Sequence, residues 1–375
     1  MILKSGSFEK MAQYIKNANK SIVLFGAGAI GTVVLPEILH ELNLDNQIEG
    51  YIDNDSRRWG EKINCHYTVQ NIYPPEYLDS LINEAVILLS ISRYMEVLRQ
   101  LEQLEYTKRV VCYIIPMMFI QNKTYTLNHG LIRDFENAMI PKKIHYMWLG
   151  KKTIPEKLQY CINSWKKYCP DYEIIRWDES NYDVFKNEYM GQAYEAGAYG
   201  FVPDYARLDI LFQHGGIYLD TDVELLRNLD DLLYQEAFCS VEKWQLINFG
   251  GCSGSIKGSE SIKKIIENRK QIRFINPDGS LNRNTCGYYD TQAVLKNGYK
   301  INGKNQKIFG MNIYASDYFH PYDYMSGRID ITENTFSIHH FHGGWLDEKM
   351  KEANRSAAQE YESVYRQTLL ENEDE

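Results

Sequence analysis

Short apolar runs alternate with helix-like segments through the first third of the chain, and this pattern restricts the possible folds most strongly. Residues 21–25, 48–52, 85–90 and 110–115 have the length and composition of buried strands. Segments with helical spacing separate them, for example at 94–104. This β-α-β alternation predicts an α/β fold with a parallel, doubly wound sheet. We therefore expect a Rossmann-like domain over residues 1–125.

A glycine-rich turn follows the first of these strands. Gly26, Gly28 and Gly31 have the G-x-G-x-x-G spacing, and Asp53 ends the next strand. In a nucleotide-binding domain such glycines let the backbone approach a pyrophosphate, and the acid binds a ribose. The same glycines could serve only the turn and its packing, so ligand binding and a structural role stay equally open. No Tyr-x-x-x-Lys dyad follows the turn in this domain, which disfavours redox chemistry.

The rest of the chain repeats the α/β pattern after a polar linker. The linker covers 126–138, and residues 131–139 have helical spacing. A strand at 143–149, a helix at 156–167 and a strand at 173–177 follow. The final residues, 347–375, have the pattern of one charged amphipathic helix. These features predict a second domain over residues 139–375.

Two aspartates follow a short apolar strand in this second domain. A predicted helix ends at Gly215 and Gly216, residues 217–219 form the strand, and Asp220 and Asp222 come directly after it. Ligands of open α/β sheets collect at the carboxyl ends of the strands. Two such carboxylates can bind one hard cation, Mg²⁺ or Mn²⁺, which usually also contacts substrate phosphates. The pattern therefore predicts a cation that stabilises negative charge on a departing diphosphate.

Asp204 and Arg207 lie one turn apart on the helix that precedes this strand. One interpretation is a surface ion pair in which the aspartate complements the helix N-terminus. The other is that both side chains reach the sugar of a bound donor, because carboxylates and guanidinium groups form strong hydrogen bonds. The position of the helix next to the two aspartates favours the second interpretation.

Four segments resemble the DXD-containing sugar-transferase family, glycosyltransferase family 32-like, which includes capsular polysaccharide synthesis enzymes, initiating mannosyltransferases and, distantly, clostridial glucosylating toxins. They are IPKKIHYMWLG at 140–150, PDYARLDIL at 203–211, GGIYLDTDVE at 215–224 and IHHFHGGW at 338–345. The segments occur in the order of the family. The resemblance implies a GT-A-type fold, a nucleotide-sugar donor, a Mn²⁺ or Mg²⁺ ion and retention of anomeric configuration.

The resemblance also implies roles for individual residues. The expected catalytic residues are Asp204, Arg207, Asp220 and Asp222. The expected donor-binding residues are Trp148, Gly150, Asp204, Arg207, Asp220 and Trp345. Trp148 matches the tryptophan that stacks on the nucleotide base, although core packing is the alternative for both tryptophans.

The sequence departs from the family pattern at two positions. Pro203 replaces a serine at the start of the helix, and Gly344 replaces a serine near the C-terminal end of the motifs. We expect a histidine to compensate for the second change, so His340 and His342 are predicted to bind metal with Asp220 and Asp222. If residues 339–342 form a strand, His340 and His342 share one face and His339 points away.

Composition excludes several classes of protein. The net charge is −9 and no long basic run occurs, which disfavours nucleic-acid binding. The seven cysteines are scattered without a zinc-like spacing, as expected for reduced thiols. The N-terminus lacks the pattern of a signal peptide, and the apolar runs are too short to cross a bilayer. We expect a cytoplasmic protein, and contact with the inner face of the membrane stays open.

These features predict a metal-dependent retaining hexosyltransferase. Its donor would be a nucleotide sugar, with a UDP-sugar favoured, and its acceptor a glycan or lipid-linked oligosaccharide in surface polysaccharide synthesis. The first alternative is an NAD-dependent nucleotide-sugar oxidoreductase that uses the first domain. The second is a non-catalytic nucleotide-sugar-binding protein, against which the intact Asp204, Arg207, Asp220 and Asp222 argue.

Overall fold

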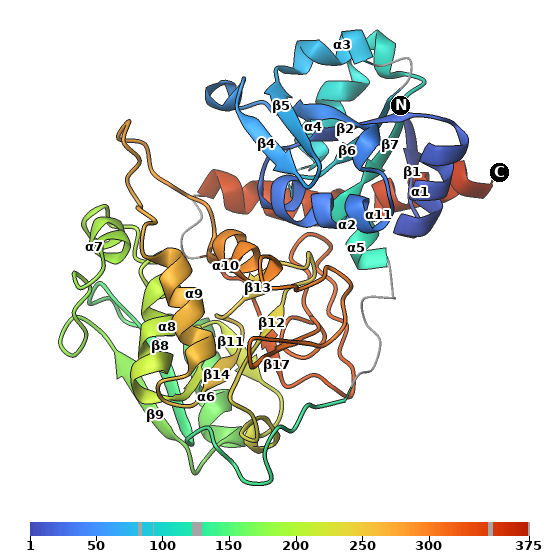
Figure 1. The fold of residues 1–375 in the computed structure, drawn as a ribbon. Coiled ribbons are helices and arrows are strands. Elements are labelled where there is room, and N and C mark those ends of the chain that lie inside the picture. The colour runs from blue at the N-terminus through green and yellow to red at the C-terminus, as the bar shows by residue number, and fades with distance from the viewer. Residues whose placement is uncertain (82–84, 93, 122–129, 344–347, 374–375) are drawn as a thin grey trace. The chain divides into compact units, whose positions relative to one another are not determined.

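The chain forms two compact units in a computed structural model, which describes residues 1–81, 85–92, 94–121, 130–343 and 348–373 (Figure 1). The first unit contains residues 1–124, 324–327 and 348–375, and the second contains residues 125–323 and 328–347. Both units combine helices with sheets that contain parallel strands, so the predicted α/β class is confirmed.

The first unit is built on a sheet with the order β1-β7-β6-β2-β3-β5-β4 among the described residues. All neighbouring strands are parallel except β4 and β5, which form a hairpin that the sequence pattern did not predict. The central strand β2 lies between β3 and β6, which is the arrangement of a doubly wound sheet. The strands are β1 (Ile2–Lys4), β2 (Ser21–Phe25), β3 (Ile48–Ile52), β4 (Lys62–Cys65), β5 (Thr68–Tyr73), β6 (Ala85–Leu89) and β7 (Val111–Ile114).

The helices of the first unit include one from the far end of the chain. Helix α11 groups with this unit, whereas the sequence prediction assigned it to the second domain. Tyr361 and Val364 of α11 are buried, and Glu360 pairs with Arg99 of α4 at 2.5 Å. The helices are α1 (Phe8–Asn17), α2 (Leu35–Glu41), α3 (Leu78–Leu81), α4 (Tyr94–Glu102), α5 (Ile115–Gln121) and α11 (Glu348–Glu373), with a π-helical segment at Ile30–Val34 before α2.

The second unit contains a mixed sheet with the order β15-β16-β12-β14-β10-β8-β9, and β13 pairs with β12. Strands β9, β8 and β10 are parallel, and β14 joins β10 in antiparallel orientation. A separate antiparallel pair, β11 and β17, carries the candidate site. The strands are β8 (Lys143–Met147), β9 (Glu173–Trp177), β10 (Gly216–Tyr218), β11 (Val223–Leu225), β12 (Ala237–Val241), β13 (Ile247–Asn248), β14 (Ser253–Ser255), β15 (Gln306–Ile308), β16 (Met311–Tyr314) and β17 (Ser337–His339).

Five helices of the second unit lie within the described residues: α6 (Glu156–Tyr168), α7 (Glu188–Glu195), α8 (Pro203–His214), α9 (Glu260–Arg269) and α10 (Cys286–Leu295). The predicted helix at 131–139 is wrong. Those residues are irregular, because the backbone N–H groups of Asp134 and Met139 donate to carbonyls at Tyr234 and Leu233 instead of to one another. In the described part of the chain, no helix is long and apolar enough to cross a membrane.

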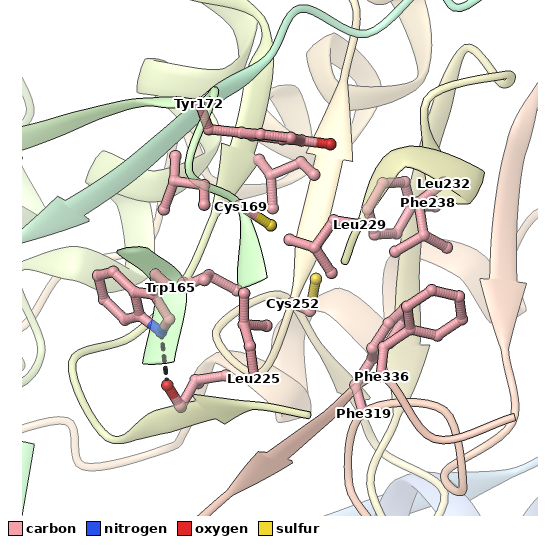
Figure 2. Packing of buried hydrophobic residues seen from close by; sticks show 14 of the residues in the cluster. Trp165, Cys169, Tyr172, Leu225, Leu229, Leu232, Phe238, Cys252, Phe319 and Phe336 are labelled. Atoms are coloured by element: carbon pink, nitrogen blue, oxygen red, sulfur yellow. Dashed lines mark hydrogen bonds between the residues drawn. The ribbon is translucent and has the colours of Figure 1, made fainter. Parts of the chain in front are cut away.

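A buried hydrophobic cluster fixes the segment that follows the two aspartates. Trp165 of α6 is fully buried, and its indole N–H donates to the carbonyl oxygen of Val223 at 2.7 Å. Figure 2 shows this hydrogen bond and the packing of Leu225 in the same cluster. Asp222 immediately precedes Val223, so the core holds the backbone of the candidate site in place.

Candidate metal centre and adjoining charged cluster

Asp220 and Asp222 occupy the turn between β10 and β11. Gly215 has φ 66° and Gly216 has φ 103°, and this left-handed backbone turns α8 directly into β10. The N–H of Asp220 donates to the carbonyl oxygen of Gly250 at 2.8 Å, and the N–H of Val223 donates to that of Asp220. The predicted order of helix, glycine pair, strand and carboxylates is therefore present, and backbone hydrogen bonds hold the turn that carries the two aspartates.

His339 faces this turn because β17 pairs with β11. Val223 lies opposite His339 in the antiparallel register. The Nε2 atom of His339 is 3.2 Å from Oδ1 of Asp222. Asp220, Asp222 and His339 each offer one ligand atom, and these atoms lie within 4.8 Å of one another.

The electrostatics of this cluster suit a cation. Burial acts to raise the pKa of Asp222, but the facing His339 imidazole and hydrogen bonds outweigh it and hold that pKa well below its usual range. Burial acts to lower the pKa of His339, but the Asp222 carboxylate raises it above the usual histidine value. The Nδ1 atom of His339 is buried and has no hydrogen-bond partner among the described residues. Two carboxylates and an imidazole are a common ligand set for a divalent transition-metal ion.

His340 and His342 are placed differently from the prediction. The strand ends at His339, and Phe341 takes a left-handed backbone with φ 47°, so the expected alternation breaks. The Nε2 atom of His340 lies 3.0 Å from Glu224. The backbone N–H of His342 donates to Oδ2 of Asp222 at 2.8 Å, and its side chain is not part of the cluster.

Asp204 and Arg207 form a buried charged cluster with Asp220. The two residues are only 6% and 4% exposed, so a surface ion pair is excluded. The Arg207 guanidinium lies 3.4 Å from Asp204 and 3.3 Å from Asp220. Its Nε atom is buried and has no hydrogen-bond partner among the described residues.

The carboxylate of Asp204 has an unusual environment. Tyr189 of α7 donates to its Oδ2 at 3.4 Å. Burial raises the pKa of Asp204 to about 6, although the guanidinium groups of Arg207 and Arg269 act to lower it. A buried, perturbed acid beside a candidate metal site is typical of functional sites.

The predicted donor-binding residues Trp148 and Gly150 follow strand β8. The backbone N–H of Trp148 donates to Trp177, and its indole N–H donates to the carbonyl oxygen of Lys152 at 2.7 Å. Gly150 has φ 84°, and its N–H donates to the Glu179 carboxylate at 2.7 Å. Trp345 and Gly344 lie outside the described residues.

The glycine turn of the first unit is explained by packing at two of its positions. A Cβ on Gly26 would lie 1.9 Å from Ile91, and one on Gly31 would lie 2.1 Å from the Gly26 carbonyl oxygen, whereas Gly28 has open space. The two oxygens of Asp53 accept the backbone N–H groups of Ala27 and Asp55, each at 2.8 Å. Asp53 therefore holds the turn, and ribose binding by Asp53 stays a prediction.

Several residues of the site were not identified from the sequence. A Cβ on Gly250 would lie 2.1 Å from Oδ2 of Asp220, so only glycine fits against this carboxylate. The Gly250-Gly251 pair after a strand was a signal that could have been used. Arg269, which donates to the carbonyl oxygen of Cys286 beside Arg207, gave no such signal, because single charged residues on helices are common.

Comparison with known proteins agrees with the geometry. A family model described as "Glycosyltransferase sugar-binding region containing DXD motif" matches residues 155–239. Inositol phosphoceramide mannosyltransferase 3 of Schizosaccharomyces pombe is 33% identical over 171 residues, which are 42% of this chain and 47% of that protein. An uncharacterized glycosyltransferase of Acanthamoeba polyphaga mimivirus is 26% identical over 49% of this chain and 74% of its own length.

A bacterial protein is also similar. Subversion of eukaryotic traffic protein A of Legionella pneumophila is 27% identical over 35% of this chain and 25% of its own length. The matched region is thus less than half of the yeast protein and a quarter of the Legionella protein. Together these similarities support a DXD-type glycosyltransferase.

Proposed function

We propose that the chain is a metal-dependent, retaining glycosyltransferase that moves a hexose from a nucleotide sugar. The observation that carries the proposal is the convergence of Asp220, Asp222 and His339 next to the buried guanidinium of Arg207. A nucleotide sugar needs both the cation ligands and the guanidinium, because its diphosphate requires a cation and its hydroxyl groups require hydrogen-bond partners. A UDP-sugar is the expected donor, and retention of configuration is the expected stereochemistry.

Each residue of the site has a proposed role. Asp220, Asp222 and His339 would hold the cation, and the imidazole favours Mn²⁺ over Mg²⁺, which prefers oxygen ligands. A bound cation supplies stabilisation of the negative charge that grows on the departing diphosphate. Arg207 would orient Asp204 and Asp220 through its two ion pairs. Because these groups are buried and already oriented, they act on the transition state without reorganisation.

The proposed acceptor is a glycan or a lipid-linked oligosaccharide in surface polysaccharide synthesis. The name of the yeast relative includes inositol phosphoceramide, a lipid, which supports an acceptor carried by a membrane. A lipid-linked acceptor would require peripheral contact of the enzyme with the inner face of the membrane.

A donor screen tests the proposal. Purified protein is mixed with UDP- and GDP-hexoses and Mn²⁺, and release of the nucleoside diphosphate is measured beside an Asp222→Ala variant. We expect one donor class to be hydrolysed slowly in a metal-dependent way, and the variant to lose this activity. The proposal fails if no nucleotide sugar is bound or hydrolysed, or if Asp222→Ala matches the wild type. The anomeric configuration of the released or transferred sugar, followed by NMR, tests retention.

For the first unit, nucleotide binding at the glycine turn remains a proposal. The strand order and the open space at Gly28 support it, whereas the engaged oxygens of Asp53 support a structural role. Titration with NAD(H), NADP(H) and UDP, read by thermal shift in wild type and Gly28→Val, separates the two. A shift with NADH that Gly28→Val abolishes would favour the oxidoreductase alternative.

A further inference from the structure

A second buried ion pair lies directly behind the Arg207 cluster. Arg269, the last residue of α9, is 3% exposed, and Asp290 of α10 is 1% exposed. The guanidinium donates to both oxygens of the carboxylate, from Nε and from Nη2, each at 2.8 Å. A two-pronged bond of this kind fixes distance and orientation together. The pair therefore sets the position of α10 relative to α9.

The pair is connected to the candidate site through Cys286. The Nη2 atom of Arg269 also donates to the carbonyl oxygen of Cys286, the first residue of α10, at 3.1 Å. The sulfur atom of Cys286 is 3.6 Å from Nη1 of Arg207 and accepts its hydrogen bond. A single chain of contacts thus runs from Asp290 through Arg269 and Cys286 to the guanidinium that pairs with Asp204 and Asp220.

The middle of α10 is linked to the Asp220 side of the same cluster. Thr291 accepts the backbone N–H of Ile247 in β13 at 2.8 Å. Asn248, the next residue, accepts the N–H of Gly250, and the Gly250 carbonyl oxygen accepts the N–H of Asp220. Helix α10 therefore contacts Arg207 directly and is linked to Asp220 through β13 and Gly250.

The charge of Arg269 also acts on the Arg207–Asp204 pair. Burial has the largest effect on the pKa of Asp204 and disfavours its ionised form. The positive charge of Arg207, followed by that of Arg269, favours the ionised form, and the negative charge of Asp290 opposes it more weakly. Arg269 is thus one of two positive charges that keep a buried carboxylate ionised in a medium that disfavours it. Neither Arg269 nor Asp290 needs to contact a donor to have this effect.

We infer that Arg269 and Asp290 are positioning residues that hold the Arg207–Asp204 pair in its donor-binding geometry through α10. The inference rests on the proposed function, because it assumes that this pair contacts the donor sugar. It predicts that loss of the ion pair impairs use of the sugar far more than binding of the nucleotide diphosphate, which depends on the cation at Asp222 and His339.

The experiment replaces both partners at once with Arg269→Met and Asp290→Leu. Exchange of a buried ion pair for apolar side chains is often neutral for stability, so the fold is kept while the directional bonds are lost. We expect a Tm close to that of the wild type and binding of UDP or GDP with Mn²⁺ close to that of the wild type. We expect kcat/KM for hydrolysis of the best nucleotide sugar to fall by roughly tenfold to a hundredfold, since small displacements of aligned groups are costly.

Two controls make the outcome decisive. Glu260→Gln with Lys263→Met removes an exposed ion pair on the same helix and should leave every value unchanged. If the double apolar variant does not fold, Arg269→Lys takes its place, because it keeps the charge but cannot form the two-pronged bond. A folded variant that hydrolyses the donor like the wild type overturns the inference alone. A wild type that hydrolyses no donor overturns the proposed function and this inference with it.

Discussion

Burial of the Asp204 carboxylate raises its pKa to about 6, from an ordinary value of 3.8 in an unfolded chain. Between these values the folded protein binds the proton more tightly than the unfolded chain does, so this group destabilises the fold as the pH rises through about 6. Hydrolysis of the donor should depend on pH in the opposite direction, because only the ionised carboxylate pairs with Arg207. We expect kcat/KM at saturating Mn²⁺ to fall as the pH drops below about 6.

The Asp204→Asn variant separates these two effects. It removes a buried charge while keeping the shape of the side chain, so we expect its Tm at pH 8 to equal or exceed that of the wild type. Hydrolysis of the donor should fall by about a hundredfold or more, and the remaining activity should lose its acidic limb. Thermal melts and pH profiles of kcat/KM measure both. A variant that melts well below the wild type yet keeps full activity would contradict a role in donor binding.

We predict that replacing His339 and replacing His340 have different effects on metal binding. His339 lies against Asp222, whereas His340 pairs with Glu224. We expect His339→Ala to weaken the apparent affinity for Mn²⁺ by about tenfold to a hundredfold or more, and His340→Ala to leave it nearly unchanged. Calorimetric titration with Mn²⁺ in the presence of UDP or GDP measures the difference. Equal losses in both variants would return His340 to the ligand set that the sequence predicted.

The pKa of His339 adds a pH dependence to the same titration. A histidine must be neutral to bind a metal, and Asp222 raises the pKa of this one above the usual value. Affinity for Mn²⁺ should therefore decline as the pH falls through the neutral range, and the decline should be much weaker in His339→Ala. A wild-type affinity that does not change with pH would argue against His339 as a ligand.

Gly250 provides a steric test of the geometry. A methyl group there would lie 2.1 Å from Oδ2 of Asp220 and 2.9 Å from Nη1 of Arg207, so both must move. We expect Gly250→Ala to reduce kcat/KM by about a hundredfold, because aligned charges are displaced. The matched control is Gly191→Ala on α7, where the added methyl meets only the exposed Phe185 ring, at 3.2 Å. Similar activities of the two variants would refute the arrangement of Asp220 and Arg207.

At the scale of elements, helix α6 supports the turn that carries Asp220 and Asp222. Trp165 donates to the Val223 carbonyl oxygen from a fully buried position, directly after Asp222. Trp165→Phe leaves that carbonyl without its partner and should lower the free energy of unfolding by about 1–3 kcal/mol. We also expect weaker binding of Mn²⁺, since the turn loses its anchor. Urea unfolding and metal titration measure these changes, and Lys166→Ala, exposed on the same helix, should change neither.

Elements with a strong local pattern were predicted well. Helix α8 is formed at Pro203–His214 and strand β9 at Glu173–Trp177, close to the expected bounds, because their periodicity and end signals lie within a few residues. The helix predicted at 131–139 did not form, because backbone N–H groups of this segment donate to the carbonyl oxygens of Leu233 and Tyr234. Helix α10 was missed because its apolar residues are spread around the helix, so the sequence shows little helical periodicity there.

At the scale of the whole molecule, helix α11 belongs to the first unit although it is last in the chain. Removal of residues 348–375 should therefore loosen the first sheet and leave the candidate site intact. We expect faster amide hydrogen exchange in β1 and α4, where α11 packs and where Arg99 pairs with Glu360, and unchanged exchange in α8 and β10. Faster exchange throughout α8 and β10 would show instead that the second unit depends on this helix.

The α/β class, the order of the main elements and the presence of Asp204, Arg207, Asp220 and Asp222 around one strand end could be predicted from the amino-acid sequence alone. These features depend on residues that are close together in the chain, because periodicity, glycines and helix-end residues determine helices, strands and turns locally. The three-dimensional fold was needed to show that His339 joins the aspartates, because its position depends on the register of β11 against β17. It likewise decided that Arg269 and Asp290 stand behind Arg207, since packing between helices is not encoded in the spacing of either helix alone.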